Sequence, residues 1–163
     1  IDDLLGGVMG RCVGQGEISL LHVKDEAAEI PIGCAVCYES VYGEYYTDYV
    51  RKGARAMTII TNDAWWGDTP GYRQHLSYSS LRAIETRRAI ARCANTGISA
   101  IISPSGEINQ PTPWWEPAVI KGNIPLRDDV TFYVAHGDIT GRICTFLFLL
   151  LLAALGVQLI TRK

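Results

Sequence analysis

The sequence predicts an α/β fold followed by one transmembrane helix. Two short apolar runs, residues 30–37 and 56–61, have the composition of buried strands, and a segment of helical character follows each of them. Near the C-terminal end, residues 143–160 form an uncharged apolar run of the length that crosses a bilayer. Turn residues separate these segments, as expected for strands that alternate with helices in an open sheet.

Length and charge limit the classes of function. The chain has 163 residues, which suits one modest domain or part of a larger one, and because it begins at Ile1 we interpret it as a fragment. The net charge of −2 gives no basic surface, so we expect no nucleic-acid partner. Hydrophobic residues make up 48% of the chain, and much of this excess lies in the C-terminal run.

The N-terminal half contains the two clearest strands. Residues 1–29 are rich in glycine and charge, which predicts a loop with an edge strand. Residues 30–37 form the first buried strand, and the helix expected over 42–53 ends at a glycine. After the strand 56–61, residues 62–71 contain Asn, Asp, Gly and Pro, and are expected to form a loop.

The second half is expected to begin with the long helix Gln74–Asn95, which Gly97 ends in the C-terminal glycine position. A third strand is predicted at Ile98–Ser103 and a fourth at Ala118–Ile124. Residues 125–140 form a polar linker to the membrane helix.

The terminal apolar run predicts that the chain spans the membrane and in which orientation. As a helix, residues 143–160 would be about 27 Å long, close to the thickness of the hydrocarbon core. A buried core helix is the alternative, but a short chain cannot surround its own terminus with protein. The pair Arg162-Lys163 favours a cytoplasmic C-terminus and an extracytoplasmic domain, although Arg142 at the other end weakens this asymmetry. The predicted division is a domain over 1–140 and a membrane helix with a basic tail over 141–163.

The spacing of the cysteines and the segments around them indicate which cysteine is a candidate for catalysis. The sequence has five cysteines, and only Cys34 and Cys37 form a C-x-x-C pair, which is compatible with a redox pair or half of a zinc site. A redox pair usually opens a helix, whereas Cys34 lies inside the apolar run. A zinc site needs two further ligands, and the histidines are scattered. We therefore expect no metal, with one buried cysteine and one functional cysteine.

Cys37 is the candidate nucleophile. It ends the first strand and precedes a helix, so its sulfur would be lifted out of the sheet beside backbone N–H groups that can bind an oxyanion. A helix N-terminus also favours the thiolate. A buried structural cysteine explains the position equally well, and position alone leaves both interpretations open.

A resemblance to a known family favours the first interpretation. Val36-Cys37-Tyr38-Glu39 resembles the Cys-Tyr-Glu elbow of the nitrilase superfamily. Thr61–Asp68, Thr-Asn-Asp-Ala-Trp-Trp-Gly-Asp, is similar to the loop of the apolipoprotein N-acyltransferase branch. The same order continues in the segments 74–76, 81–88, 92–99 and 104–107. An ordered series of motifs over residues 30–160 is much stronger evidence than a single motif.

The resemblance implies a nitrilase α/β/β/α sandwich, of which this chain is the C-terminal half, and a Glu–Lys–Cys mechanism. Only the cysteine maps onto this chain, at Cys37. Lys24 and the glutamates Glu17, Glu26 and Glu29 lack the family's sequence context. The general base and the lysine are therefore expected upstream, and the fragment alone is expected to be inactive.

Further site residues are proposed around the thiol. Tyr38 would donate its backbone N–H to the oxyanion. Glu39 would orient the lysine or a substrate ammonium, or else serve the helix N-terminus as a structural carboxylate. Trp65 and Trp66 are expected to bind substrate acyl chains near the membrane surface, with burial in the core as the alternative.

Other conspicuous residues are expected to be structural. Trp114-Trp115 would pack against the domain, and His75 and His136 would be satisfied structural histidines. Glu85 would form a bridge with Arg82 or Arg88.

The implied function is transfer of a fatty acyl group from a phospholipid, through a cysteine thioester, to the amine of a diacylglyceryl-apolipoprotein, without a cofactor. The enzyme would lie in the bacterial inner membrane with its catalytic domain on the periplasmic side. A nitrilase-type amidase acting on small amides is one alternative. A second alternative is a non-catalytic membrane-tethered fragment. This alternative predicts that the catalytic Glu and Lys are missing from the chain.

Overall fold

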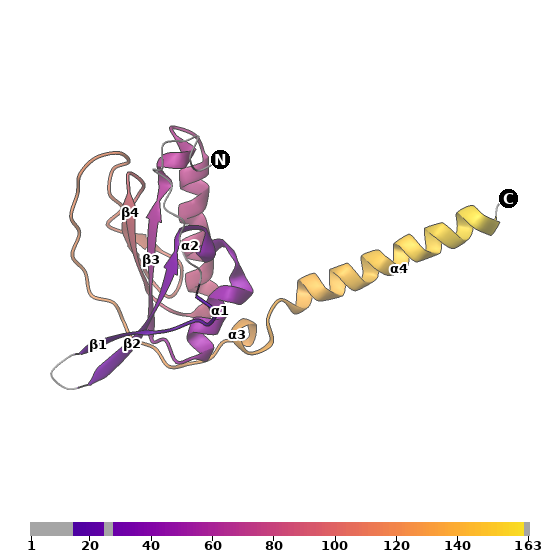
Figure 1. Ribbon diagram of the computed structural model, residues 1–163, viewed down its shortest axis with the longest axis horizontal. Helices are drawn as coiled ribbons and strands as arrows, with labels where there is room; N and C mark the ends of the chain where they lie inside the picture. The colour runs from indigo at the N-terminus through magenta and orange to yellow at the C-terminus, as the bar shows by residue number, and fades with distance from the viewer. Residues whose placement is uncertain (1–14, 25–27, 162–163) are drawn as a thin grey trace.

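A computed structural model describes residues 15–24 and 28–161. The predictions for Glu26 and for the pair Arg162-Lys163 fall outside these residues. The described chain forms one mixed sheet, helices that cover one of its faces, and a separate C-terminal helix that extends away from the domain (Figure 1). The predicted α/β class with a terminal apolar helix is thus confirmed.

The sheet has six strands, in the order β1-β2-β3-β4-β5-β6. The strands β2, β3 and β4 are parallel, and the other neighbours are antiparallel. The edge strand β1 confirms the strand expected within residues 1–29. The bounds are β1 Leu21–Lys24, β2 Glu29–Val36, β3 Ala56–Asn62, β4 Ile90–Asn95, β5 Ala100–Ile102 and β6 Ile108–Asn109.

Two α-helices cover one face of this sheet, α1 and α2 (Figure 1). Each connects two parallel strands, as crossover helices do. Short 3₁₀ turns, η1 and η2, follow β2 and β3. The bounds are η1 Cys37–Val41, α1 Gly43–Arg51, η2 Asp63–Trp66, α2 Gly71–Thr86, α3 Phe132–His136 and α4 Ile139–Thr161.

The core lies between the sheet and α1 and α2. Met57 and Ile59 point into it from β3 and are 0% exposed, as is Tyr46 from α1. Side chains alternate across a strand, so this face of β3 is buried while Ile60, on the other face, is 53% exposed. Burial of each large apolar side chain contributes about 1.5–3 kcal/mol, so this layer determines which face the helices cover.

The opposite face of the sheet is apolar and open. Val36, Ile60 and Cys93 lie side by side in the register of β2, β3 and β4, and all three are exposed. A sheet face of this composition is normally covered by another layer. This one-sided covering matches the half of an α/β/β/α sandwich that the sequence predicts.

The predicted long helix is wrong in its second half. Helix α2 ends at Thr86, and Arg87 turns the chain with a left-handed φ of 53°. The strand β4 then begins at Ile90, so Gly97 does not end the helix. Sequence propensity misses this break because an arginine occupies the position that glycine commonly takes at a helix end.

The predicted fourth strand, Ala118–Ile124, is also wrong, because the segment has no regular secondary structure. Proline residues flank it, and proline cannot donate a ladder hydrogen bond. The polar linker predicted after it contains helix α3, which Thr131 caps by accepting a hydrogen bond from the backbone N–H of Val134 at 3.1 Å.

Helix α4 has 23 residues and a mean hydropathy of 2.6 over its most apolar window, none of which is buried. At 1.5 Å per residue it is about 35 Å long, which is enough to cross a bilayer. It contains the predicted apolar run 143–160 and begins four residues earlier.

Candidate active site

Cys37 lies where β2 ends and the chain turns into η1. Its φ is 53°, a left-handed conformation that costs a non-glycine residue about 1–3 kcal/mol. Such strain persists where the surrounding structure imposes it, often at functional sites. The thiol is neither sealed in the core nor fully exposed. The predicted bend after the strand is present, although it is a 3₁₀ turn rather than the start of an α-helix.

Hydrogen bonds on both sides of Cys37 hold this bend. Glu39 accepts a hydrogen bond from the backbone N–H of Val36 at 2.7 Å. Ser40 donates its hydroxyl hydrogen to the carbonyl oxygen of Cys37 at 2.8 Å. Glu39 therefore acts as the structural carboxylate at the start of η1, which was one of its two predicted roles.

A buried polar network lies next to the thiol. Its centre is Asp63, the first residue after β3, which is 0% exposed. Arg92 Nη2 lies 2.6 Å from Asp63 Oδ2, and His75 Nδ1 lies 2.8 Å from Oδ1. His75 Nε2 lies 3.3 Å from the carbonyl oxygen of Cys37. The Thr61 hydroxyl lies 3.0 Å from Asp63 Oδ1 and 3.3 Å from Cys37 Sγ.

The charges of this network compensate each other. Burial acts to raise the pKa of Asp63, but the hydrogen bond from His75 and the charge of Arg92 outweigh it, so the pKa lies below its ordinary value. Burial lowers the pKa of Arg92, and the charge of Asp63 opposes this effect. The pair is thus ionised at neutral pH. Among the described residues, Arg92 Nη1 has no hydrogen-bond partner.

Asp63, Arg92 and Thr61 were not predicted as site residues. Arg92 was expected within the helix Gln74–Asn95, whereas it lies in β4. The available signal was that Asp63 directly follows a buried strand, because carboxyl ends of parallel strands share one sheet edge. His75 is a buried histidine with partners at both ring nitrogens, as expected for a structural role.

Two of the predicted aromatic residues, Tyr38 and Trp66, lie close to each other beside the cysteine. The Tyr38 ring lies 6.4 Å from that of Trp66 and 6.1 Å from that of His75. Trp65 is 73% exposed, so it does not belong to the core. Trp114 stacks on Tyr72 at 5.2 Å, as the packing interpretation of that tryptophan expects.

No hydrogen bond of Cys37 involves a described lysine, Lys24, Lys52 or Lys121. Lys24 pairs with Glu29 in the sheet, at the start of β2, whereas Cys37 follows the end of that strand. At about 3.3 Å per residue, the length of β2 separates the backbones of Glu29 and Cys37 by roughly 26 Å. Lys52 donates to the carbonyl oxygen of Ile18. Within residues 15–24 and 28–161 there is also no group of three or more metal-ligating side chains.

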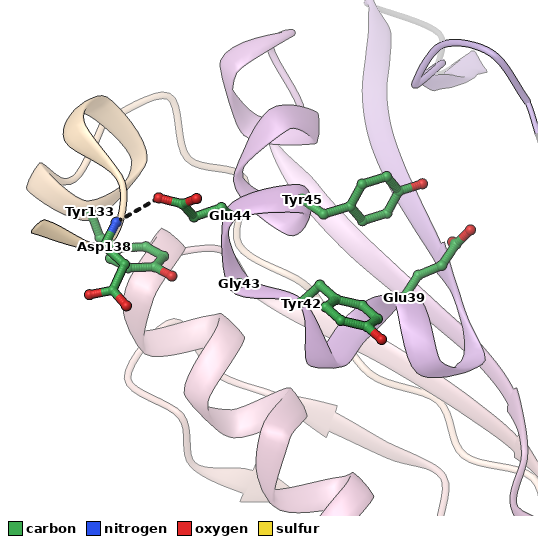
Figure 2. Close-up of a pocket in the computed structure, with 7 residues that line it drawn as sticks. All are labelled: Glu39, Tyr42, Gly43, Glu44, Tyr45, Tyr133 and Asp138. Carbon is green, nitrogen blue, oxygen red and sulfur yellow. Dashed lines mark hydrogen bonds between the residues drawn. The ribbon is translucent and has the colours of Figure 1, made fainter. Parts of the chain in front are cut away.

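A cavity of about 630 Å³ lies between the η1–α1 segment and the start of α4 (Figure 2). Cys37 does not line it. Glu44 accepts hydrogen bonds here from the backbone N–H of Asp138 at 2.9 Å and from Arg142 at 2.7 Å. Because Glu44 is already bonded within the chain, we attribute this cavity to the junction of the domain with α4. Its lining residues are Glu39, Tyr42, Gly43, Glu44, Tyr45, Tyr133 and Asp138.

The chain thus has a helix-covered sheet with a cysteine at the carboxyl edge of its parallel strands. The chain belongs to the carbon-nitrogen hydrolase family, whose family model matches residues 11–129. Two solved structures share the fold. One is a Saccharomyces cerevisiae member of branch 10 of the nitrilase superfamily, with TM-score 0.52 and 19% identity over 64% of this chain and 40% of that one. The other is an amidase from Nesterenkonia, with TM-score 0.50 and 19% identity over 74% and 45%.

Within this family the chain is similar to apolipoprotein N-acyltransferases. The protein of that name from Chlorobaculum tepidum is 41% identical over 142 residues, which are 86% of this chain and 26% of the relative. The protein from Geobacter metallireducens is 41% identical over 113 residues, 69% of this chain and 22% of the relative. These matches confirm the resemblance found in the sequence. The chain spans about a quarter of the length of these curated relatives.

Proposed function

We propose that this chain is the C-terminal part of a membrane-bound N-acyltransferase whose nucleophile is Cys37. The transfer would move a fatty acyl group from a phospholipid to the N-terminal amine of an apolipoprotein. The observation that carries this proposal is the strained bend at Cys37, which presents a thiol at the carboxyl edge of the parallel strands. The similarity to apolipoprotein N-acyltransferases supports the choice of reaction.

The reaction proceeds in two acyl transfers. The Cys37 thiolate attacks the ester carbonyl carbon of the phospholipid, and the backbone N–H of Tyr38 stabilises the oxyanion. The ester C–O bond breaks, the lysophospholipid oxygen takes up a proton, and a thioester remains on Cys37. The amine of the apolipoprotein then attacks the thioester carbonyl, loses a proton to a base, and releases the thiolate. The general base and the oxyanion lysine come from the part of the protein upstream of this chain.

We place residues 1–140 in the catalytic domain and 141–163 in a membrane-spanning helix with a basic tail. Arg142, at the other end of α4, pairs with Glu44 at 2.7 Å. The two cationic residues Arg162-Lys163 outnumber Arg142 and favour a cytoplasmic C-terminus, with the domain on the periplasmic side of the inner membrane. Trp65 and Trp66 are exposed, and Trp66 lies beside Tyr38, so we assign the two tryptophans to contacts with acyl chains.

Acyl labelling of the purified full-length protein in detergent tests the proposal. Phospholipid with a radiolabelled acyl chain is expected to label the protein through a hydroxylamine-sensitive thioester. Cys37→Ala is expected to abolish the label, while Cys93→Ala, which removes an exposed cysteine of β4, is expected to retain it. A label that persists in Cys37→Ala would remove this cysteine from its proposed role.

The two alternatives give different results in the same preparation. A small-amide amidase would release ammonia from aliphatic amides and take no label from phospholipid. A non-catalytic fragment would have no upstream reading frame that encodes a Glu, a Lys and further membrane helices. We expect the 163-residue chain alone to be inactive, because no described lysine hydrogen-bonds to Cys37.

A further inference from the structure

Thr61 lies between the candidate nucleophile and a buried carboxylate. It belongs to β3, the strand next to β2, and is 5% exposed. Its Oγ1 is 3.3 Å from Cys37 Sγ and 3.0 Å from Asp63 Oδ1. A hydroxyl group has one proton, so Thr61 donates to only one of these two acceptors at a time.

A thiol and a thiolate at Cys37 offer Thr61 different hydrogen bonds. A thiol can donate its S–H to Thr61 Oγ1, which leaves the Thr61 proton for Asp63. A thiolate, formed when the thiol proton passes to water, is an anion and a stronger acceptor, so the Thr61 O–H can turn towards Cys37 Sγ. No covalent bond of Thr61 breaks in this change.

Asp63 can release the Thr61 hydrogen bond without becoming an unsatisfied buried carboxylate. Arg92 remains on Oδ2 at 2.6 Å, and His75 remains on Oδ1 at 2.8 Å. A buried acceptor that keeps charged or strong donors does not incur the full desolvation penalty when one weaker donor leaves. Asp63 therefore keeps a donor on each of its oxygens when the Thr61 hydroxyl turns to the sulfur.

We propose that Thr61 is a positioning residue, whose hydroxyl holds the sulfur of Cys37 and stabilises its thiolate by one hydrogen bond. This inference rests on the proposed role of Cys37 as nucleophile. A hydrogen bond to an ionised acceptor is about twice as strong as a neutral one, so its loss is expected to slow the reactions of Cys37 at neutral pH by about tenfold.

Alkylation of Cys37 by iodoacetamide measures this effect without any substrate. The full-length protein in detergent is alkylated over a range of pH, and mass spectrometry follows the peptide that contains Cys37. Thr61→Val, which keeps the shape and removes the hydroxyl, is expected to react about tenfold more slowly at pH 7, with the midpoint of the pH–rate profile at higher pH. Thr61→Ser is expected to react within about twofold of the unchanged protein, since it retains the hydroxyl.

Thr58→Val is the matched control on the same strand. The Thr58 hydroxyl donates to the carbonyl oxygen of Gly33 at 3.1 Å and does not contact the thiol. Its substitution is expected to leave the alkylation profile unchanged. If Thr61→Val does not fold, the comparison is made between Thr61→Ala and Thr61→Ser. A profile for Thr61→Val, or for Thr61→Ala, that superimposes on that of Thr61→Ser would overturn the inference.

Acyl labelling separates this inference from the proposed function. If phospholipid labels the protein and Thr61→Val alkylates at the normal rate, the role of Thr61 is refuted and the acyltransferase proposal stands. If phospholipid gives no label but Thr61→Val alkylates slowly, the reaction proposed for the protein is wrong and the contact between Thr61 and the thiol is supported.

Discussion

Replacing Asp63 by asparagine tests whether the buried network stabilises the fold around Cys37. Both carboxylate oxygens bind donors, Arg92 at 2.6 Å and His75 at 2.8 Å. Asp63→Asn keeps the shape, removes the charge and directs an amide NH₂ group at one of these donors. The Arg92 side chain, which is 0% exposed, is then a buried charge without a counter-ion.

The expected loss follows from this burial. Removing one partner of a buried ion pair costs about 3–5 kcal/mol. For a domain of this size, each kcal/mol lowers Tm by about 2–4 °C, so Asp63→Asn is expected to lower Tm by about 6–20 °C. Intrinsic tryptophan fluorescence, recorded while the full-length protein is heated in detergent, measures the change.

A double-mutant cycle shows whether the loss comes from the ion pair. Asp63→Asn and Arg92→Met each leave one charge unpaired, whereas the double variant leaves neither, so its loss is expected to be smaller than the two single losses added together. Arg127→Gln, which breaks an exposed pair with Asp129, is the control and is expected to leave Tm unchanged. Strictly additive losses, or a Tm for Asp63→Asn equal to that of the control, would refute the reasoning.

Four further predictions follow from the same structure. The folded-state pKa of Asp63 lies below its ordinary value of 3.8. The Asp63 carboxylate therefore contributes its full share of stability above about pH 4, and this share is lost as pH falls through the folded-state pKa. Asp63→Asn is expected to flatten that part of a Tm–pH curve. Ile60→Asp on the open sheet face is expected to increase the solubility of the isolated 163-residue chain and to destabilise the full-length protein, as sedimentation and Tm would show. Gly33→Ala would place a Cβ 2.9 Å from that of Tyr49 and is expected to cost about 1–3 kcal/mol, read as a fall in Tm. Glu44→Ala removes both hydrogen bonds at the start of α4 and is expected to speed limited proteolysis of residues 137–142, and an unchanged cleavage rate would contradict the assigned role.

The strands that flank the candidate nucleophile could be predicted because their apolar runs are short and bounded by turn residues. Residues 30–37 and 56–61 correspond closely to β2 and β3, and the uncharged terminal run to α4. The strand β4 could not be predicted in this way. Its sequence, Ile-Ala-Arg-Cys-Ala-Asn, contains good helix formers, and only its pairing with β3 makes it a strand.

The candidate site was predictable only in part, for a related reason. The cysteine and its turn are local in sequence, so a local motif identifies them. The network of Asp63, His75 and Arg92 joins residues up to 29 positions apart, and its members meet only once β3 and β4 are in register and α2 has packed on the sheet. Arg92 was also assigned to a helix, where its side chain would have been solvated. An error in one element therefore concealed the ion pair.

The order of the strands has a consequence for how this protein is made. In the described sheet every strand hydrogen-bonds to the strand that precedes it in the chain. A polypeptide that leaves a ribosome or a translocation pore with its N-terminus first can therefore add each new strand to an edge that is already present. Because α4 follows β6 in the chain, it emerges after every strand of the described sheet. The described strands can thus pair before α4 is available to enter the bilayer.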